Sequence, residues 1–355
     1  MRTRRHISSV ILPAMGMLLL ILDSKTAIQG AADGINLCIY SVIPSLFPFF
    51  ALSILLTNNI LSSNYRKETD NKRMQAFAHP SISLFAVGLL GGYPTGAQAV
   101  TEAYHNGYLS RKTACRLLGF CSNAGPAFIF GFAGQLFSVT FIPWLLWLIH
   151  IISALAVSRL IPITEKDHNR IEPGECISLQ QAFSKSLHAI ASVCGWIILF
   201  RVLIAFFDRW FFWLLPATAR ILFSGLLELA NGIVLLKEVE SEAVRFICCS
   251  ILLAFGGCCV GMQTSSVTKE LGTGWYFPGK LLQSAVSGIL SIPAVKLIYG
   301  YSPNMPIHVT LMIVAALIVI FCIAARKIPI AFLRENVYNN QKHSRELSLC
   351  SFEKR

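Results

Sequence analysis

Two copies of one glycine-rich frame combine unusual residue types with a repeated spacing. The frame is Gly-Gly-x-x-x-Gly-x-Gln, and it runs from Gly91 to Gln98 and again from Gly256 to Gln263. Glycine weakens a helix and lets backbones approach closely, and a glutamine in apolar surroundings needs a hydrogen-bonding partner. A matched pair of interrupted hydrophobic segments in two halves of a membrane chain marks the solute site of transporters. The frames therefore predict solute binding.

A further interruption lies in the apolar segment 113–137, in the run from Ser122 to Pro126. The residue before a proline is pushed out of the helical region, and proline itself suits the first turn of a new helix. We therefore predict a half-helix that begins at Pro126 inside the membrane. Its unpaired N–H groups and positive dipole end suit an anionic group. A proline kink packed by neighbouring helices is the structural alternative.

Two charged residues lie inside apolar runs of the second half, Arg201 and Glu228. A charge in hydrocarbon costs at least ~2.5–3.5 kcal/mol, so each requires a partner or a watery cavity. We interpret Glu228 as a residue that couples transport to a proton or cation; the alternative is a structural ion pair with Arg220 or Arg201. The planar guanidinium of Arg201 suits a substrate carboxylate, although snorkelling toward the interface near Asp208 explains its position as well.

These features define the expected substrate site. Arg116 and Lys280 flank helix starts and are interpreted as interface anchors, with attraction of an anion into the site as the alternative. His150 is interpreted as a satisfied core or interface histidine. The expected substrate-binding residues are Gly92, Tyr93, Pro94, Gly96, Gln98, Asn123, Gly125, Pro126, Arg201, Asn231, Gly257, Gly261 and Gln263, with Glu228 as the coupling residue.

The composition is typical of a polytopic membrane protein. Of 355 residues, 54% are hydrophobic and 14% are charged, and the mean hydropathy is +0.60. A helix needs ~20 mainly apolar residues to cross hydrocarbon, which predicts about eight to ten membrane segments in an all-α bundle with two structural repeats. The expected spans are 7–23, 35–58, 113–137, 139–160, 186–207, 211–236, 281–299 and 307–325, with interrupted or re-entrant helices at 81–100 and 246–266.

The basic residues lie mainly at the termini and in loops. The 30 Lys and Arg exceed the 18 Asp and Glu, giving +12, and this distribution follows the positive-inside rule rather than a nucleic-acid surface. We expect both termini in the cytoplasm; a cleaved signal peptide over 1–32 is the alternative. If both glycine segments re-enter on one side, the repeats run parallel. If the first crosses fully, they form an inverted repeat.

Common catalytic, metal-binding and phosphate-binding motifs are absent from the sequence. The sequence contains no Gly-x-Ser-x-Gly, His-Glu-x-x-His or phosphate-loop motif, and its eleven cysteines form no Cys-x-x-Cys pair. We therefore expect no catalytic residue, metal, cofactor or nucleic-acid partner, and a homo-oligomer is compatible with the sequence.

Polar stretches divide the chain into six parts. The expected divisions are an N-terminal transmembrane helix with its lead-in (1–32), a first repeat (33–160), a polar hinge loop (161–180), a second repeat (181–300), a C-terminal transmembrane helix (301–327) and a cytoplasmic tail (328–355).

The motif regions resemble a known family. Gly-Gly-Tyr-Pro-Thr-Gly-Ala at 91–97, Glu102-Ala103-Tyr104, and the run from Leu117 to Pro126 look like the sporulation integral membrane protein YlbJ family. The second half is similar through Leu227-Glu228, Asn231-Gly232 and the second frame, so the likeness spans most of 35–300. One departure is that Cys258-Cys259-Val260 does not match Tyr93-Pro94-Thr95.

The resemblance implies a nucleoside-recognition Gate domain in both repeats and an origin in an endospore-forming Firmicute. It also implies transport of dipicolinate, a planar pyridine dicarboxylate, from the mother cell toward the forespore, in the cell membrane or the outer forespore membrane. The sequence contains no nucleotide-hydrolysing module, so alternating access would be driven by the solute gradient or by coupled protons. Two alternatives remain: a spore-envelope scaffold without transport, and a nucleoside or ion gate.

Overall fold

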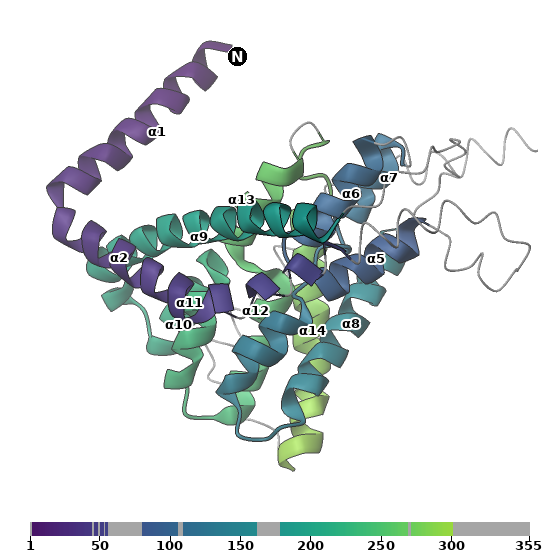
Figure 1. The fold of residues 1–355 in the computed structure, drawn as a ribbon. Coiled ribbons are helices and arrows are strands. Elements are labelled where there is room, and N and C mark those ends of the chain that lie inside the picture. Colours follow the sequence, from purple (N-terminus) through teal and green to yellow (C-terminus); the bar gives the residue numbers. More distant parts are fainter. Residues whose placement is uncertain are drawn as a thin grey trace, which may run out of the picture. The chain divides into compact units, whose positions relative to one another are not determined.

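The computed structural model describes residues 2–44, 46–48, 50–52, 54–55, 80–105, 109–161, 178–268 and 271–300 (Figure 1). Helices form throughout these ranges, and no strand occurs within them. The predicted all-α membrane bundle is confirmed. The expected C-terminal helix at 301–327, the tail at 328–355 and most of the hinge loop lie outside the described residues.

Membrane-length helices make up much of the described chain. By length and composition, four helical segments suffice to cross a membrane, or five if the bent pair Ser24–Val42 and Leu46–Leu52 is one span. The number is below the expected eight to ten because several apolar segments are divided into shorter helices and because 301–355 are not described. The four are Ile142–Leu160, Leu179–Trp210, Glu242–Thr268 and Tyr276–Tyr299.

The N-terminal helix α2 (Ser24–Leu37) packs along α9 (Leu179–Trp210), which has 32 residues and extends beyond the expected span 186–207 at both ends (Figure 1). A small residue permits this approach, because a Cβ on Gly34 would lie 2.9 Å from the Cα of Ile198. The remaining N-terminal elements are α1 (Arg2–Leu22) and a π-helical turn η1 (Cys38–Val42).

The first half is interrupted at both places that the sequence predicted. Gly92, with φ +75°, Tyr93 and Pro94 separate two helices. The chain is also non-helical from Ser122 to Gly125, and Pro126 begins the next helix, as predicted. The elements are α5 (Pro80–Gly91), α6 (Thr95–His105), α7 (Arg111–Leu117), the π-helix η2 (Ala127–Phe132), the 3-10 helix η3 (Ala133–Leu136) and α8 (Ile142–Leu160).

The second half contains one predicted break and one that was not predicted. Gly256 and Gly257, with φ +82° and +83°, interrupt the second frame. The expected continuous span 211–236 is wrong, because Glu228 is extended (φ −141°, ψ 117°) and its side chain caps a new helix. The elements are η4 (Phe212–Leu214), α10 (Ala217–Leu227), α11 (Leu229–Leu235), η5 (Leu236–Glu238), α12 (Glu242–Phe255), α13 (Gly257–Thr268) and α14 (Tyr276–Tyr299).

The broken pair of α12 and α13 is the most enclosed of the membrane-length segments. Its most apolar window is 83% buried, against 33–44% for the other three. Non-helical backbone at membrane depth is tolerated only where protein or a water-filled cavity covers it. The second glycine break therefore lies among helices and not against lipid.

Candidate functional site

The two glycine frames contact each other. The Tyr93 hydroxyl, in the first break, donates a hydrogen bond to the backbone carbonyl of Leu253 at 3.2 Å, just before the second break. A Cβ on Gly256 would lie 3.0 Å from Cζ of the Tyr93 ring, so the ring packs on that break. Both frames are interrupted, as predicted, and the contact between them brings the two breaks face to face. Their relation by pseudo-symmetry stays a prediction.

Each frame also packs against another interruption. A Cβ on Gly125 would lie 2.9 Å from the Cα of Gly92, so the run before Pro126 rests on the first break. A Cβ on Gly257 would lie 3.1 Å from the backbone nitrogen of Leu229, next to the Glu228 break. The glycines therefore bring four interrupted backbones close together.

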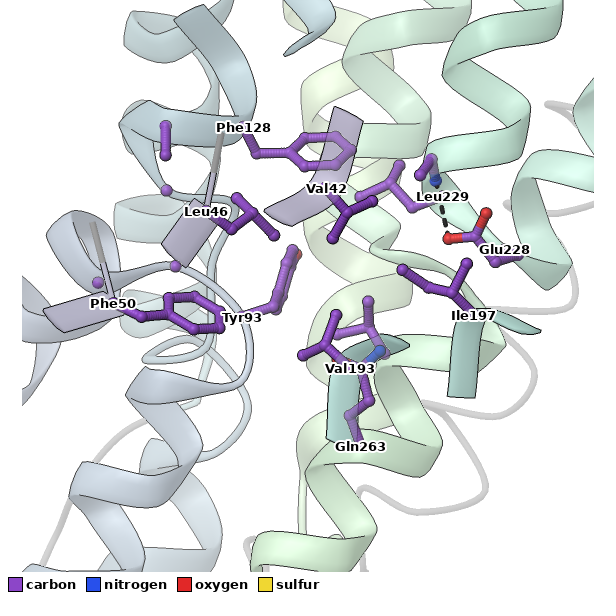
Figure 2. A pocket seen from close by; sticks show the side chains of 16 residues that line it. Val42, Leu46, Phe50, Tyr93, Phe128, Val193, Ile197, Glu228, Leu229 and Gln263 are labelled. Carbon is purple, nitrogen blue, oxygen red and sulfur yellow. Dashed lines mark hydrogen bonds between the residues drawn. The ribbon is translucent and has the colours of Figure 1, made fainter. Parts of the chain in front are cut away.

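A cavity lies where these segments meet. Figure 2 shows Tyr93 on one side of it, with Glu228 and Gln263 on the other. The predicted site residues that line it are Gly92, Tyr93, Gly125, Glu228 and Gln263. The remaining lining residues are Val42, Leu46, Phe50, Gly91, Ala127, Phe128, Val193, Ile197, Leu229, Ala230 and Val260.

The cavity combines a mainly apolar lining with a few polar groups, as small-molecule sites do. The polar side chains are the Glu228 carboxylate, the Gln263 amide and the Tyr93 phenol. Its volume of about 50 Å³ leaves room for a few water molecules but not for an aromatic ring. An aromatic solute therefore requires the breaks to separate.

Glu228 is 2% exposed and caps the start of α11. Its Oε1 accepts a hydrogen bond from the Ala230 backbone nitrogen at 2.9 Å, and its Oε2 accepts one from the Asn231 nitrogen at 2.6 Å. These bonds stabilise a carboxylate without a cationic side chain. Sequence reasoning placed Glu228 correctly among apolar residues but missed the helix start that it makes.

Arg201 does not line the cavity. It forms an ion pair with Asp33 at 3.0 Å and donates to the Asn231 side-chain oxygen at 2.5 Å. Arg201 was expected to hold a substrate carboxylate or to snorkel toward Asp208, and its observed partners are instead Asp33 and Asn231. A substrate role for Arg201 stays a prediction. The expected ion pair between Glu228 and Arg201 is not formed. The expected ion pair between Arg220 and Glu228 is not formed either, because Arg220 pairs with Glu238 at 3.3 Å.

Lys280 differs from the expected interface anchor, because it is 0% exposed. Its Nζ donates to Gln283 Oε1 at 2.5 Å and to Asn123 Oδ1 at 3.3 Å. The Gln283 amide donates in turn to Asn123 Oδ1 at 3.0 Å. His150 joins this group as a core histidine whose Nε2 accepts from the Ala124 backbone nitrogen at 3.1 Å.

The other predicted residues do not line the cavity. Gln98 donates to Glu102 on its own helix at 3.1 Å, whereas Gln263 lines the cavity, so the glutamines of the two frames are not equivalent. Pro126 lines a separate groove of about 610 Å³ beside Trp144 and Trp147. Pro94, Gly96, Asn123, Asn231, Gly257 and Gly261 do not line the cavity.

Several lining residues gave no signal in the sequence. Phe50, Phe128 and Ile197 are apolar residues of apolar segments, and nothing in their type or spacing separates a cavity wall from a lipid-facing surface. Lys280 did give a signal, a charge near an apolar run, but its position at the start of α14 favoured the interface.

Comparison with known proteins adds one relative. No family model and no solved structure matches the chain. The chain is similar to the sporulation integral membrane protein YlbJ of Bacillus subtilis (strain 168), with 25% identity over 322 residues, which covers 78% of this chain and 79% of the relative. The resemblance to the YlbJ family is confirmed. The apolar helices agree with an integral membrane protein.

Proposed function

We propose that this chain is a sporulation membrane transporter that moves a small anionic aromatic solute, with dipicolinate as the first candidate. Transport proceeds by alternating access without ATP hydrolysis. The observation that carries the proposal is the convergence of four interrupted segments on one cavity lined by Tyr93, Glu228 and Gln263. Broken helices around a central site are the arrangement by which transporters bind solutes at membrane depth. The sporulation context rests on the relative's name.

The proposal includes a coupling role for Glu228. Its carboxylate lines the cavity and lies at the end of a polar chain through Asn231 and Arg201 to Asp33, whose side chain is 39% exposed. A carboxylate inside apolar surroundings with a polar connection to the surface is suited to exchange a proton or a cation. Asp33 supplies the exposed end of that connection.

The proposal also covers the remaining expectations. The chain acts without catalysis, cofactor or nucleic acid, and lies in the cell membrane or the outer forespore membrane with both termini in the cytoplasm. A scaffold that does not transport has no use for a cavity between broken helices that contains a carboxylate and an amide, which favours transport over that alternative. A nucleoside gate differs in its solute and is separated by experiment.

Uptake into proteoliposomes tests this proposal. Vesicles that contain the full chain should accumulate labelled dipicolinate above the level of protein-free vesicles, and uridine should not accumulate. Accumulation of uridine alone would favour the nucleoside gate. No uptake of either solute under an imposed proton gradient or solute gradient would reject transport.

Removal of the Tyr93 hydroxyl should favour the open state. Tyr93→Phe keeps the ring but removes the hydrogen bond to Leu253, which joins the two breaks. Loss of about 1 kcal/mol from the closed state alone shifts the equilibrium about fivefold toward opening. The initial rate of uptake should rise if opening limits transport. Tyr104→Phe is the control, because the Tyr104 hydroxyl forms no hydrogen bond with any described residue; a reduced rate in Tyr93→Phe only would contradict the prediction.

A further inference from the structure

Lys280 is a fully buried cation that the site described above does not use. Its two hydrogen-bonding partners, Asn123 Oδ1 and Gln283 Oε1, are neutral carbonyl oxygens. In the described ranges, no carboxylate lies within ion-pair distance of it. A charge in the membrane interior without an opposite charge is costly, and residues of this kind are retained for function.

The other enclosed cation near the cavity is already neutralised. Arg201 pairs with Asp33 at 3.0 Å and donates to Asn231. An incoming carboxylate would have to displace an internal carboxylate from Arg201, but it would meet only neutral oxygens at Lys280. Among the described residues that surround the breaks, Lys280 is therefore the better partner for an anion.

The Tyr93 ring lies near both Lys280 and the cavity. The Lys280 Nζ lies 5.3 Å from the centroid of the Tyr93 ring, within the range of a cation–π contact. The same ring lines the cavity, whereas Lys280 does not. The ring thus holds the ammonium group in the closed state with a weak, uncharged interaction. Movement of Tyr93 would expose the Lys280 amino group to the cavity, where an entering carboxylate favours its protonated form.

We propose that Lys280 is the charge partner of a solute carboxylate, and that Tyr93 covers it until the solute enters. Asn123 and Gln283 are positioning residues that hold the ammonium group by their side-chain oxygens. A planar aromatic carboxylate fits both members of the pair, because its carboxylate binds the ammonium while its ring packs on the tyrosine. This inference rests on the proposed transport of an anionic solute and names the residue that selects the anion.

Two variants remove the free charge in different ways. Lys280→Met deletes the ammonium group and keeps an unbranched apolar chain. Asn123→Asp leaves Lys280 in place but puts a carboxylate 3.3 Å from its Nζ, so the cation is neutralised from within. Asp has nearly the shape of Asn and keeps an acceptor for Gln283, but it loses the hydrogen bond that Asn123 Nδ2 donates to the Phe120 carbonyl oxygen at 2.7 Å. The two variants therefore perturb the fold in different ways, and either one that stays folded tests the inference. Lys296→Met is the matched control, since Lys296 is an exposed lysine of the same helix.

Binding of dipicolinate, benzoate and uridine to the purified full chain in nanodiscs, measured by calorimetry, tests the inference. Lys280→Met and Asn123→Asp should each weaken dipicolinate binding by about 30-fold or more, the effect expected when one side of a buried charge pair is lost. Lys296→Met should bind like the wild type. Melting temperatures of all variants show whether a loss of binding reflects unfolding.

Each outcome separates this inference from the proposed function. If the wild type binds dipicolinate and a folded Lys280→Met or Asn123→Asp binds it equally, Lys280 is not the anion partner, although transport remains supported. If the wild type binds benzoate but not dipicolinate, and both variants lose benzoate, the inference holds and the proposed solute is wrong. If the wild type binds uridine or no probe at all, the inference is overturned.

Discussion

Replacement of Glu228 by glutamine should abolish pH-dependent uptake while most of the protein remains in the membrane. The carboxylate lines the cavity and is the end of the polar chain that reaches Asp33. Glutamine keeps the length of the side chain but can bind no proton in exchange for a solute. Uptake driven by an imposed proton gradient should therefore fall to the level of protein-free vesicles, whereas exchange of solute at equal pH should persist.

The same substitution has a predictable cost in stability. Glu228 accepts from two backbone nitrogens, at 2.9 and 2.6 Å, and glutamine offers one oxygen for these two donors. Loss of one capping hydrogen bond should cost about 1 kcal/mol. A small fall in melting temperature with full membrane abundance is thus compatible with a coupling role.

The matched control is Glu238→Gln, which removes a half-exposed carboxylate paired with Arg220 in the same part of the chain. It should change neither uptake nor its pH dependence, because an exposed ion pair contributes little. Full abundance of Glu228→Gln with unchanged pH dependence would reject the coupling role. Lost abundance would instead assign Glu228 to the structure of the α10–α11 break.

The positions of the breaks were predictable where the residues themselves impose them. Pro126 cannot continue a preceding helix, and Gly92 and Gly256 adopt positive φ that other residues avoid, so their sequence positions coincide with the observed interruptions. Glu228 was singled out by its charge, but its break was missed. The sequence from Leu226 to Gly232 is typical of a continuous apolar helix. Only the structure shows that the Glu228 side chain caps a new helix, α11.

The polar partners were harder to predict because they depend on tertiary contacts. Arg201 meets Asp33, which lies 168 positions away, and Lys280 meets Asn123, which lies 157 positions away. No local spacing encodes such pairs. From the sequence, each cation was expected either at the membrane interface or beside a solute anion, and neither expectation named an internal partner. Burial between helices overrides the preference for the interface once a polar partner is available.

Introduction of a methyl group at Gly96 should severely destabilise the protein. A Cβ at this position would lie 2.0 Å from the backbone carbonyl oxygen of Cys121, and a backbone atom cannot move aside as a side chain can. Gly96→Ala must therefore displace the run that leads to Pro126, at a cost of about 3 kcal/mol or more. Membrane abundance and melting temperature should fall, and solute uptake should be lost with them.

Alanine substitutions at two other glycines, Gly195 and Gly261, serve as comparisons for Gly96→Ala. Gly195→Ala should be neutral or slightly stabilising, because no atom lies within 4 Å of its Cβ and alanine favours a helix. Gly261 occupies the position in the second frame that Gly96 occupies in the first, yet the nearest atoms to its Cβ would be side-chain atoms, Phe277 Cζ at 2.5 Å and Tyr276 Cε1 at 3.6 Å, and a side chain is able to shift. Gly261→Ala should therefore cost less than Gly96→Ala. Equal melting temperatures for these two variants would mean that the frames are equivalent after all, and that the first does not serve to bring the backbone of Cys121 against α6.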